Sequence, residues 1–413
     1  MANGHAVAAA PSSGGFAGFV KEKILLGMAP RAYVKSCCTT TNAIAAVILA
    51  VGIPLLVLRF AVGLGATTNL SQTAPWGLWI GFDMMTGIVL AAGGFTIGAT
   101  VQIFGLKEYH PIERPAILTA FLGYVMAIVG LLADLGRPWN IALFPFNSAV
   151  GTQSALFEVA WCVTLYSSVL FLEFTVPLFE WLGWRKLQAT MKKALIALTV
   201  LSVMFSTMHQ SALGSLFLLA PTKLHPLWYS GFIFIFFFIS AIIAGLCMVI
   251  VEGTISHKVF HKQLEGAHFD ADKLQLGLGK AAALVMFAYF FLKLQGVIDG
   301  HAWGYLLTGW GAWFLLEILG FVLLPAMMFA YGSRNGKVKL VQIAAVIGVL
   351  GIVLNRLNVS VIAYNWNLPT RYVPNWMEVW VSVTLCTIGV LMFRWIVNRM
   401  PILREDPRFP QEH

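Results

Sequence analysis

Residues 228–252 read WYSGFIFIFFFISAIIAGLCMVIVE, and no charged side chain interrupts this run before Glu252. An α-helix rises about 1.5 Å per residue, so about 20 apolar residues are enough to cross the ~30 Å hydrocarbon core of a bilayer. An uninterrupted run of this length is typical of a membrane-spanning helix. The stretch therefore predicts an integral membrane protein.

Similar runs continue on both sides of this stretch, with short connections between them. Short connections favour antiparallel neighbours that pack together. We therefore expect an all-α integral membrane protein with about ten transmembrane helices in antiparallel bundles. The predicted spans lie at residues 41–64, 78–105, 115–134, 155–180, 193–219, 228–252, 276–298, 309–331, 338–358 and 376–398.

The overall composition supports the same class. Hydrophobic residues make up 59% of the 413 residues and charged residues only 11%, whereas soluble domains carry about 25% charged residues. This excludes a soluble multidomain enzyme. The net charge of +9 does not indicate nucleic-acid binding, because most of the basic residues lie in loops on one side of the membrane.

Twenty-one of the 27 Lys and Arg residues fall in one set of alternate loops and in the two terminal segments. Cytoplasmic loops of membrane proteins are enriched in Lys and Arg, so both termini are predicted to be cytoplasmic. The expected organisation is a cytoplasmic or interfacial segment 1–40, a transmembrane domain 41–398 and a cytoplasmic tail 399–413. Within the first segment, residues 16–34 are predicted to form one short interfacial helix.

The sequence offers few ligands for a metal or a haem. The five Cys residues show no CxxC or CxxCH spacing. Membrane haems generally need two axial His residues inside the helices, and only His209 of the nine His residues lies well inside a predicted span. We therefore expect no haem and no metal. Any redox role would use an organic carrier and electrons from a partner.

Ionisable groups inside the membrane are costly and often mark a ligand site or a proton path. Asp83, Asp134, Glu158 and His209 come from four consecutive predicted helices and lie nearer the outer face by depth counting. Four bundled helices can bring these groups around one pocket. The alternative is structural pairing, for example of Asp134 with Arg137.

Six segments carry a resemblance to a known family: WGLWIGFDMMTGIVLAAGG from Trp76, YHPIERPAILTAFLGY from Tyr109, DLGRPWN from Asp134, ALFEVAWCVTLY from Ala155, MHQSALGSLFLLAPTKLHPLW from Met208 and IVEG from Ile250. Together they resemble the NrfD/PsrC family of membrane quinone-interacting subunits. The likeness is to its ten-helix, HybB-like branch, and within it to QrcD-type membrane subunits of the Qrc menaquinone reductase.

The resemblance implies a bacterial inner-membrane protein that binds menaquinone near the outer face and has no redox cofactor of its own. It also implies a periplasmic, ferredoxin-like iron–sulfur partner. Asp83 and His209 are the first candidates for the reacting neighbourhood. The second set of candidates is Asp134, Arg137, Glu158 and Gln210, with Trp76 and Trp139 packing on the ring unless they only anchor the protein at the headgroups.

Quinone reduction consumes protons, so a proton path is also expected. Thr86, Thr96 and Thr100 run inward from Asp83 along the same helix, and Glu173 lies at a similar inner depth. These four residues form the predicted path. Thr side chains often bond to the carbonyls of their own helix instead, and that alternative stays open.

Two complexes fit the resemblance. The preferred prediction is a menaquinone reductase whose electrons come from a periplasmic multihaem cytochrome c. The alternative is the HybB-type membrane subunit of a nickel–iron hydrogenase. A secondary transporter is a distant alternative, because such proteins also use about ten helices; they often have interrupted helices in matching repeats, and here only Gly93-Gly94 suggests such a break.

Overall fold

The computed structural model describes residues 16–143, 154–264, 269–369 and 371–405. Within these ranges every regular element is a helix, and one isolated bridge joins Leu224 to Tyr364. Ten helical stretches are long and apolar enough to cross a membrane. These findings confirm the predicted fold class, and every predicted span overlaps an observed one.

Five spans are single α-helices, and the other five change helix type along their length. The single helices are α3 (Thr40–Val62), α7 (Ala155–Leu182), α9 (Ile233–Val259), α11 (Ala271–Asp299) and α15 (Trp376–Val397). The composite spans are Trp79–Ile103 (η3 Trp79–Thr86, α4 Gly87–Leu90, α5 Gly93–Gly98, η4 Ala99–Ile103), Lys107–Asp134 (η5 Lys107–Tyr109, α6 His110–Asp134), Arg185–Leu219 (α8 Arg185–Ser215, η8 Leu216–Leu219), Gly309–Arg334 (α12 Gly309–Leu315, η10 Leu316–Leu323, α13 Leu324–Arg334) and Val338–Ile362 (α14 Val338–Leu357, η11 Asn358–Ile362). Below, Trp79–Ile103 is called span 2.

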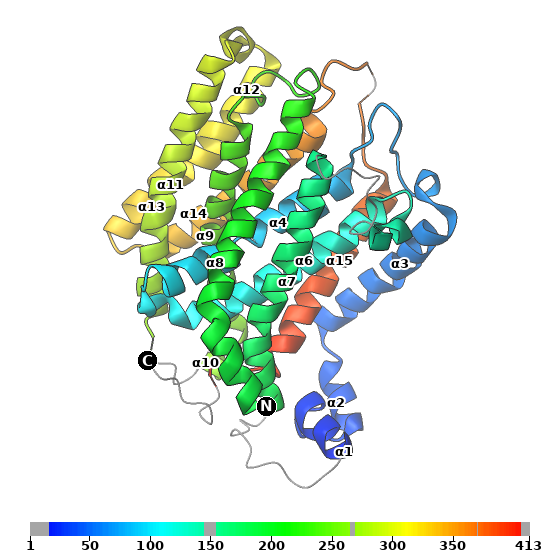
Figure 1. Cartoon of the computed structure of the whole chain (residues 1–413), viewed down its shortest axis with the longest axis vertical. Helices are drawn as coiled ribbons and strands as arrows, with labels where there is room; N and C mark the ends of the chain where they lie inside the picture. The colour runs from blue at the N-terminus through cyan, green and yellow to red at the C-terminus, as the bar shows by residue number, and fades with distance from the viewer. Residues whose placement is uncertain (1–15, 144–153, 265–268, 370, 406–413) are drawn as a thin grey trace.

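The spans form two bundles that share a boundary at α9. The first bundle contains span 2, α6, α7 and α8, and the second contains α9, α11, the α12–α13 span and α14. Helix α9 also packs on α5 and α8, which joins the two bundles. The first and last spans, α3 and α15, pair with each other, and α15 packs against α6. Figure 1 shows α3 and α15 together on one side of the molecule.

The first and last described segments lie at the same end of the helices, called the terminal end below (Figure 1). Arg399 follows α15 and donates a hydrogen bond to the carbonyl of Ile24 (3.1 Å) and another to the hydroxyl of Tyr33 (2.6 Å). Arg394 donates to Asn42 (2.9 Å). The opposite end, called the far end, carries α12. The assignment of the terminal end to the cytoplasm stays a prediction.

The N-terminal segment differs from the single helix predicted over residues 16–34. It contains two short helices, α1 (Phe16–Phe19) continuing into η1 (Val20–Ile24), and α2 (Pro30–Cys37). Leu26 and Gly27 between them have φ angles of 53° and 76°. Positive φ angles lie outside the right-handed helical region, so the backbone must reverse there. Residues 1–15 and 406–413 of the predicted terminal segments lie outside the described residues.

Span 2 is the most buried of the ten spans, and it is interrupted at Ala91 and Ala92. Neighbouring helices approach this interruption closely. A Cβ added to Gly94 would lie 2.5 Å from Cβ of Ala120, and one added to Gly245 would lie 2.8 Å from the carbonyl carbon of Ala92. The break suggested by Gly93-Gly94 therefore exists, and glycine allows α6 and α9 to pack against it.

Candidate functional site

A group of polar side chains lies fully enclosed between α6, α7 and α8. His209 on α8 is buried, and its ring centroid lies 5.9 Å from that of Tyr124 on α6. Tyr124 in turn meets Tyr166 of α7 edge-on at 4.6 Å. Gln210 and Ser206 extend the group along α8, and the Tyr124 hydroxyl lies beside both. These five residues are called the His209 cluster.

The His209 cluster leaves its hydrogen-bonding capacity unused. Among the described residues none makes a well-aligned hydrogen bond with the ring nitrogens of His209, the amide atoms of Gln210, the two tyrosine hydroxyls or the Ser206 hydroxyl. The closest neighbours are within the cluster itself and, for His209, the backbone of Val159. A buried polar group without a partner costs about 1–3 kcal/mol in protein mutational data. Seven such atoms in one place therefore form a site for waters or for a polar ligand.

Asp83 lies elsewhere in the first bundle and faces α15. Its Oδ2 accepts a hydrogen bond from the hydroxyl of Ser382 (2.5 Å), and both side chains are buried. On the other side, Asp83 packs against α6 at Gly130, where an added Cβ would lie 2.7 Å from Cβ of Asp83. The absent side chain at Gly130 therefore makes room for the carboxylate.

Asp134 belongs with Asp83, and the charge that offsets it is Arg59 of α3. Arg59 is buried and donates hydrogen bonds to the carbonyls of Ala133 and Leu135, at the end of α6. Electrostatic interactions link Asp134 with Arg59 and Glu378. Arg137, the partner suggested from the sequence, is exposed at the far end of α6. Arg59, Asp83, Asp134, Glu378 and Ser382 are called the Asp83 cluster.

Glu378 closes the Asp83 cluster at the start of α15. Its Oε1 accepts backbone hydrogen bonds from Asn69 (2.8 Å) and Asn375 (3.0 Å), and its Oε2 accepts one from the hydroxyl of Tyr372. Tyr372 also accepts a bond from the backbone N–H of Leu78 (3.0 Å). The burial of Tyr372 and its bond to Glu378 raise the pKa of this phenol, so it remains a hydrogen-bond donor.

The structure thus divides the predicted site residues. Asp83 and Asp134 fall in one cluster, while His209 and Gln210 fall in another that contacts a different side of α6. Glu158 is exposed in the first turn of α7, and Trp139 is 67% exposed. Trp76 is half-buried and stacks on Tyr364, with 5.2 Å between ring centroids. The four ionisable residues do not surround a single pocket.

The three threonines of the predicted proton path bond to their own helix. Thr86 donates to the carbonyl of Gly81, Thr96 to Ala92 and Thr100 to Thr96, at 2.7–3.0 Å. This is the alternative left open by the sequence. Their hydroxyls therefore have their donor already engaged.

Glu173 instead joins a column of polar groups toward the terminal end. Its carboxylate accepts hydrogen bonds from Thr199 (3.4 Å) and Ser202 (3.5 Å) of α8. Ser202 lies beside the hydroxyl of Tyr166 in the His209 cluster. On its other side Glu173 is electrostatically linked to Glu113.

Glu113 carries the column to the terminal end of the first bundle. It accepts a hydrogen bond from Gln102 (2.8 Å) and lies 3.9 Å from His110 at the start of α6. His110 is partly exposed, whereas Glu113 is buried. The column therefore runs from an accessible histidine toward His209. Within the described residues, hydrogen bonds hold each of the two glutamates, while the step between them and the steps on to His209 are contacts without a hydrogen bond.

A third charged group lies in the second bundle. Glu317 accepts hydrogen bonds from Asn355 (2.7 Å), Trp228 (2.7 Å) and Asn358. Lys293 lies over the rings of two phenylalanines near Glu317, and Arg356 donates to Ser240 (2.8 Å). The carboxylate of Glu317 and the guanidinium of Arg356 are hydrogen-bonded to other side chains of the protein. This group therefore fits a structural role better than the His209 cluster does.

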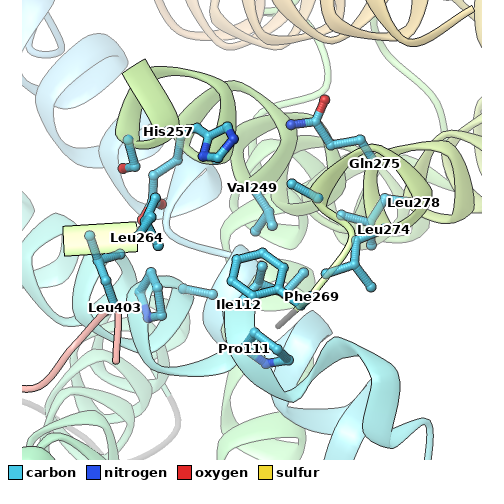
Figure 2. A pocket seen from close by; sticks show the side chains of 16 residues that line it. Pro111, Ile112, Val249, His257, Leu264, Phe269, Leu274, Gln275, Leu278 and Leu403 are labelled. Atoms are coloured by element: carbon cyan, nitrogen blue, oxygen red, sulfur yellow. The ribbon is translucent and has the colours of Figure 1, made fainter. Parts of the chain in front are cut away.

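A small pocket, with a cavity volume of about 60 Å³, lies at the terminal end between α6, α9 and α11. Figure 2 shows His257 and Gln275 at its sides and Phe269 with Ile112 between them. Glu252 lines the same pocket, and one of its oxygens accepts a bond from Thr119 (2.7 Å). The pocket is far from the Asp83 cluster and takes no part in that site.

Sequence reasoning missed Tyr124, Tyr166, Arg59 and Ser382. Arg59 was visible as a charge near the end of an apolar run, but nothing in the run shows that it turns inward. Metal binding has no support within the described ranges, where no group of three or more His, Cys, Asp or Glu side chains is placed to hold an ion.

Comparison with known proteins gives consistent relatives. A family model described as polysulphide reductase, NrfD, matches residues 66–366. A Nitratidesulfovibrio vulgaris (Hildenborough) protein, whose name states no function, is 48% identical over 92% of this chain and 98% of its own. The probable Ni/Fe-hydrogenase 2 b-type cytochrome subunit of Escherichia coli K12 is 31% identical over 84% of this chain and 88% of its own. The integral membrane subunit of menaquinone reductase from N. vulgaris is 27% identical over 85% and 87%.

These matches confirm the family resemblance drawn from the six motifs. They are consistent with the QrcD-type likeness but do not single it out, since a hydrogenase subunit is equally well covered. Ten apolar spans and relatives from bacteria indicate a multi-pass protein of the bacterial inner membrane. Two of the three relatives are named as subunits of a hydrogenase and of menaquinone reductase, and none of the three is named as a transporter. The chain belongs to the NrfD family.

Proposed function

We propose that this protein is the quinone-binding membrane subunit of a respiratory oxidoreductase complex. It exchanges electrons between an iron–sulfur partner on the outer face and menaquinone, with proton uptake. The family membership and the menaquinone reductase relative support this proposal. The hydrogen-bonding groups also fit. A quinone carbonyl accepts hydrogen bonds, as from the hydroxyl of Ser382, and a quinol hydroxyl donates them to a carboxylate such as Asp83.

The observation that carries the proposal is the division of polar groups in the first bundle. The Asp83 cluster borders α3 and α15 at the edge of the bundle, so a quinone ring arriving from lipid meets Asp83 and Ser382 first. The His209 cluster is sealed within the bundle and holds seven polar atoms that make no well-aligned hydrogen bond within the described residues. We assign ring binding to the Asp83 cluster and proton handling to the His209 cluster.

The remaining candidates have subordinate roles in this proposal. Asp134 and Gln210 belong to the two clusters. Trp76 lines the far end beside Tyr364. Arg137, Trp139 and Glu158 are exposed at the far end, where they are available to a partner subunit.

In this proposal, protons reach the His209 cluster along the column that runs from His110 to His209. Glu173 is its central member, and it replaces the threonine path as the preferred route because the threonine hydroxyls are engaged with helix carbonyls. If protons enter at the terminal end and that end is cytoplasmic, quinone reduction moves charge across the membrane. Each elementary charge moved is worth about 2.3 kcal/mol per 100 mV.

Within this function we prefer a menaquinone reductase fed by a periplasmic multihaem cytochrome c. The hydrogenase-type subunit is the second candidate, and the 31% identity to a hydrogenase subunit favours it specifically. Purification of the native complex distinguishes the two, because co-purifying haem or nickel–iron subunits identify the electron donor.

The proposal is tested with Asp83→Asn and His209→Phe in the native complex. Both variants should lower quinone turnover by about 10²-fold, the usual contribution of a positioned proton-transfer group, while the partner subunits still co-purify. Met208→Leu, a lipid-facing change next to His209, is the control. Unchanged turnover in Asp83→Asn would remove Asp83 from the site.

A further inference from the structure

An apolar groove runs along the lipid-facing side of the first bundle, between α3 and α15. Ile44 and Ile48 of α3 form one wall and Val383 of α15 forms the other, while Leu78 and Phe82 at the start of span 2 form the floor. The groove extends along α15 as far as Arg394. Val259, the last residue of α9, also lines it, so the groove is bounded by four spans that are far apart in the sequence.

Ser382 is one of the few polar residues in the groove lining, with Thr41, Thr387 and Arg394, and it is the one that bonds to Asp83. Ser382 lines the groove, and its hydroxyl donates to Oδ2 of Asp83. Ser382 lies six residues into α15, which is ~9 Å from the far end of that helix. The groove therefore joins the lipid phase to the Asp83 cluster below the level of the headgroups.

The shape and chemistry of the groove match one class of lipid better than another. From Ser382 to Arg394 the groove follows twelve residues, or ~18 Å, of helix. A phospholipid carries its polar atoms at the interface, and its acyl chains have nothing to offer Ser382 at this depth. An isoprenoid quinone carries ring carbonyls on a long apolar tail, so its ring can lie at Ser382 while its tail follows the groove.

We propose that the α3–α15 groove is the lateral access route and tail-binding site of the quinone, with the ring at Ser382 and Asp83. This inference rests on the proposed function and adds the place of binding to it. The tail runs along α15 toward the terminal end, between Ile44 and Val390. Neither α7 nor α8 takes part in binding the tail.

The test uses the purified native complex in nanodiscs of phosphatidylethanolamine and phosphatidylglycerol. A menaquinone analogue with a diazirine on its tail is photolysed, and the labelled peptides are identified by mass spectrometry. Label is expected on residues 41–48 and 379–390, and excess unlabelled menaquinone should suppress it. A diazirine phospholipid is the parallel probe.

Two tryptophan variants on α15 give the matched comparison. Cys386→Trp places a bulky ring in the groove and should lower groove labelling by about tenfold, as overpacking at a binding site does. Met392→Trp lies on the exposed face of the same helix outside the groove and should leave labelling unchanged. Equal labelling in both variants contradicts the proposal.

The remaining outcomes separate this inference from the proposed function. Displaceable label found only on α7 or α8 overturns the groove and keeps a quinone site. Groove label that the phospholipid probe reproduces and menaquinone fails to displace identifies an ordinary lipid groove and overturns the inference. Absence of any displaceable label on the chain overturns the proposed function as well.

Discussion

Glu173 belongs to both possible proton routes, whereas Thr96 belongs to the threonine path alone. Its carboxylate is held by Thr199 and Ser202 of α8, on the line between Tyr166 and Glu113. A carboxyl group in this position can bind and release a proton, whereas the hydroxyl of Thr96 is engaged with its own helix. Substitutions at these two positions therefore test the route directly.

Glu173→Gln should slow quinone turnover by about tenfold or more, because the amide keeps the hydrogen-bonding shape but carries no exchangeable acid proton. Thr96→Val removes a hydroxyl from the threonine path and should leave turnover near that of the unsubstituted protein. Steady-state rates of the complex with a short-tailed menaquinone analogue measure both. A loss of turnover in Thr96→Val would favour the threonine path, and unchanged turnover in Glu173→Gln would contradict both routes.

His225 connects pH to the stability of the far end. Its ring lies among Trp366, Trp310 and Tyr305, with centroid distances of 4.7–5.1 Å, and its Nδ1 accepts a hydrogen bond from the backbone of Leu227 (3.2 Å). Burial lowers the pKa of His225 from 6.5 to about 4. The folded protein therefore holds this side chain neutral.

Because the unfolded chain binds the proton more readily, His225 contributes its full stability above about pH 6.5 and loses it as the pH falls toward 4. The melting temperature in detergent should fall over this window. His225→Asn should make the fall shallower, while the exposed His301→Asn should not change it. An unchanged slope in His225→Asn would assign the pH dependence to other groups.

The predicted site illustrates what a single sequence can specify at residue scale. Depth along a span changes by only about 1.5 Å per residue, while the side-chain direction turns by about 100°. The sequence therefore gives the positions of Asp83 and His209 along their spans, but it does not show that their side chains face Ser382 and Tyr124. Arg59 was missed for the same reason, since its inward direction depends on the rotation of α3.

Span 2 shows at the scale of an element how glycine sets helix distances. Gly245 of α9 faces the interruption in span 2, where an added Cβ would lie 2.8 Å from the carbonyl carbon of Ala92. That contact is with backbone atoms, which cannot rotate away. The interruption and its neighbours must therefore shift as a unit if a side chain is added.

Gly245→Ala should destabilise the folded protein by about 1–3 kcal/mol, the usual cost of overpacking, and lower its melting temperature in detergent. Gly87→Ala is the control in span 2 itself, because an added Cβ there lies 3.7 Å from Ala127 in ordinary contact. Equal melting temperatures in the two variants would show that the interface relaxes.

The elements themselves were largely predictable. Apolar runs identify all ten spans, because a helix must be apolar over the full thickness of the bilayer whether it faces lipid or other helices. The type changes within spans were not predictable, and η10 in the eighth span is an example. Such π-helical turns depend on packing against neighbouring helices, which the residues of one run do not encode.

At the scale of the whole molecule, orientation is the property that the proposed function most needs. The Asp83 cluster lies toward the far end and His110 at the terminal end, so the direction of proton uptake follows from which end is cytoplasmic. The basic residues predict that the terminal end is cytoplasmic. The fold itself shows only that both described ends of the chain lie together.

Single cysteines report the orientation in spheroplasts. In a background with Cys37, Cys38 and Cys386 each replaced by Ser, which leaves only the buried Cys162 and Cys247, Thr222→Cys at the far end should react with a membrane-impermeant maleimide. Asn335→Cys, exposed between α13 and α14, should react only after the cells are lysed. Labelling of Asn335→Cys in intact spheroplasts would invert the topology and the predicted direction of charge movement.

The pairing of α3 with α15 has a consequence for biosynthesis. The first span leaves the ribosome early, yet its main helical partner is the last span to be made. Until translation ends, α3 lacks its main helical partner and can dock only through its smaller contact with α6, and Asp83 and Asp134 lack Ser382 and Glu378. A nascent or truncated chain therefore has no complete Asp83 cluster, and only the finished polypeptide can assemble one.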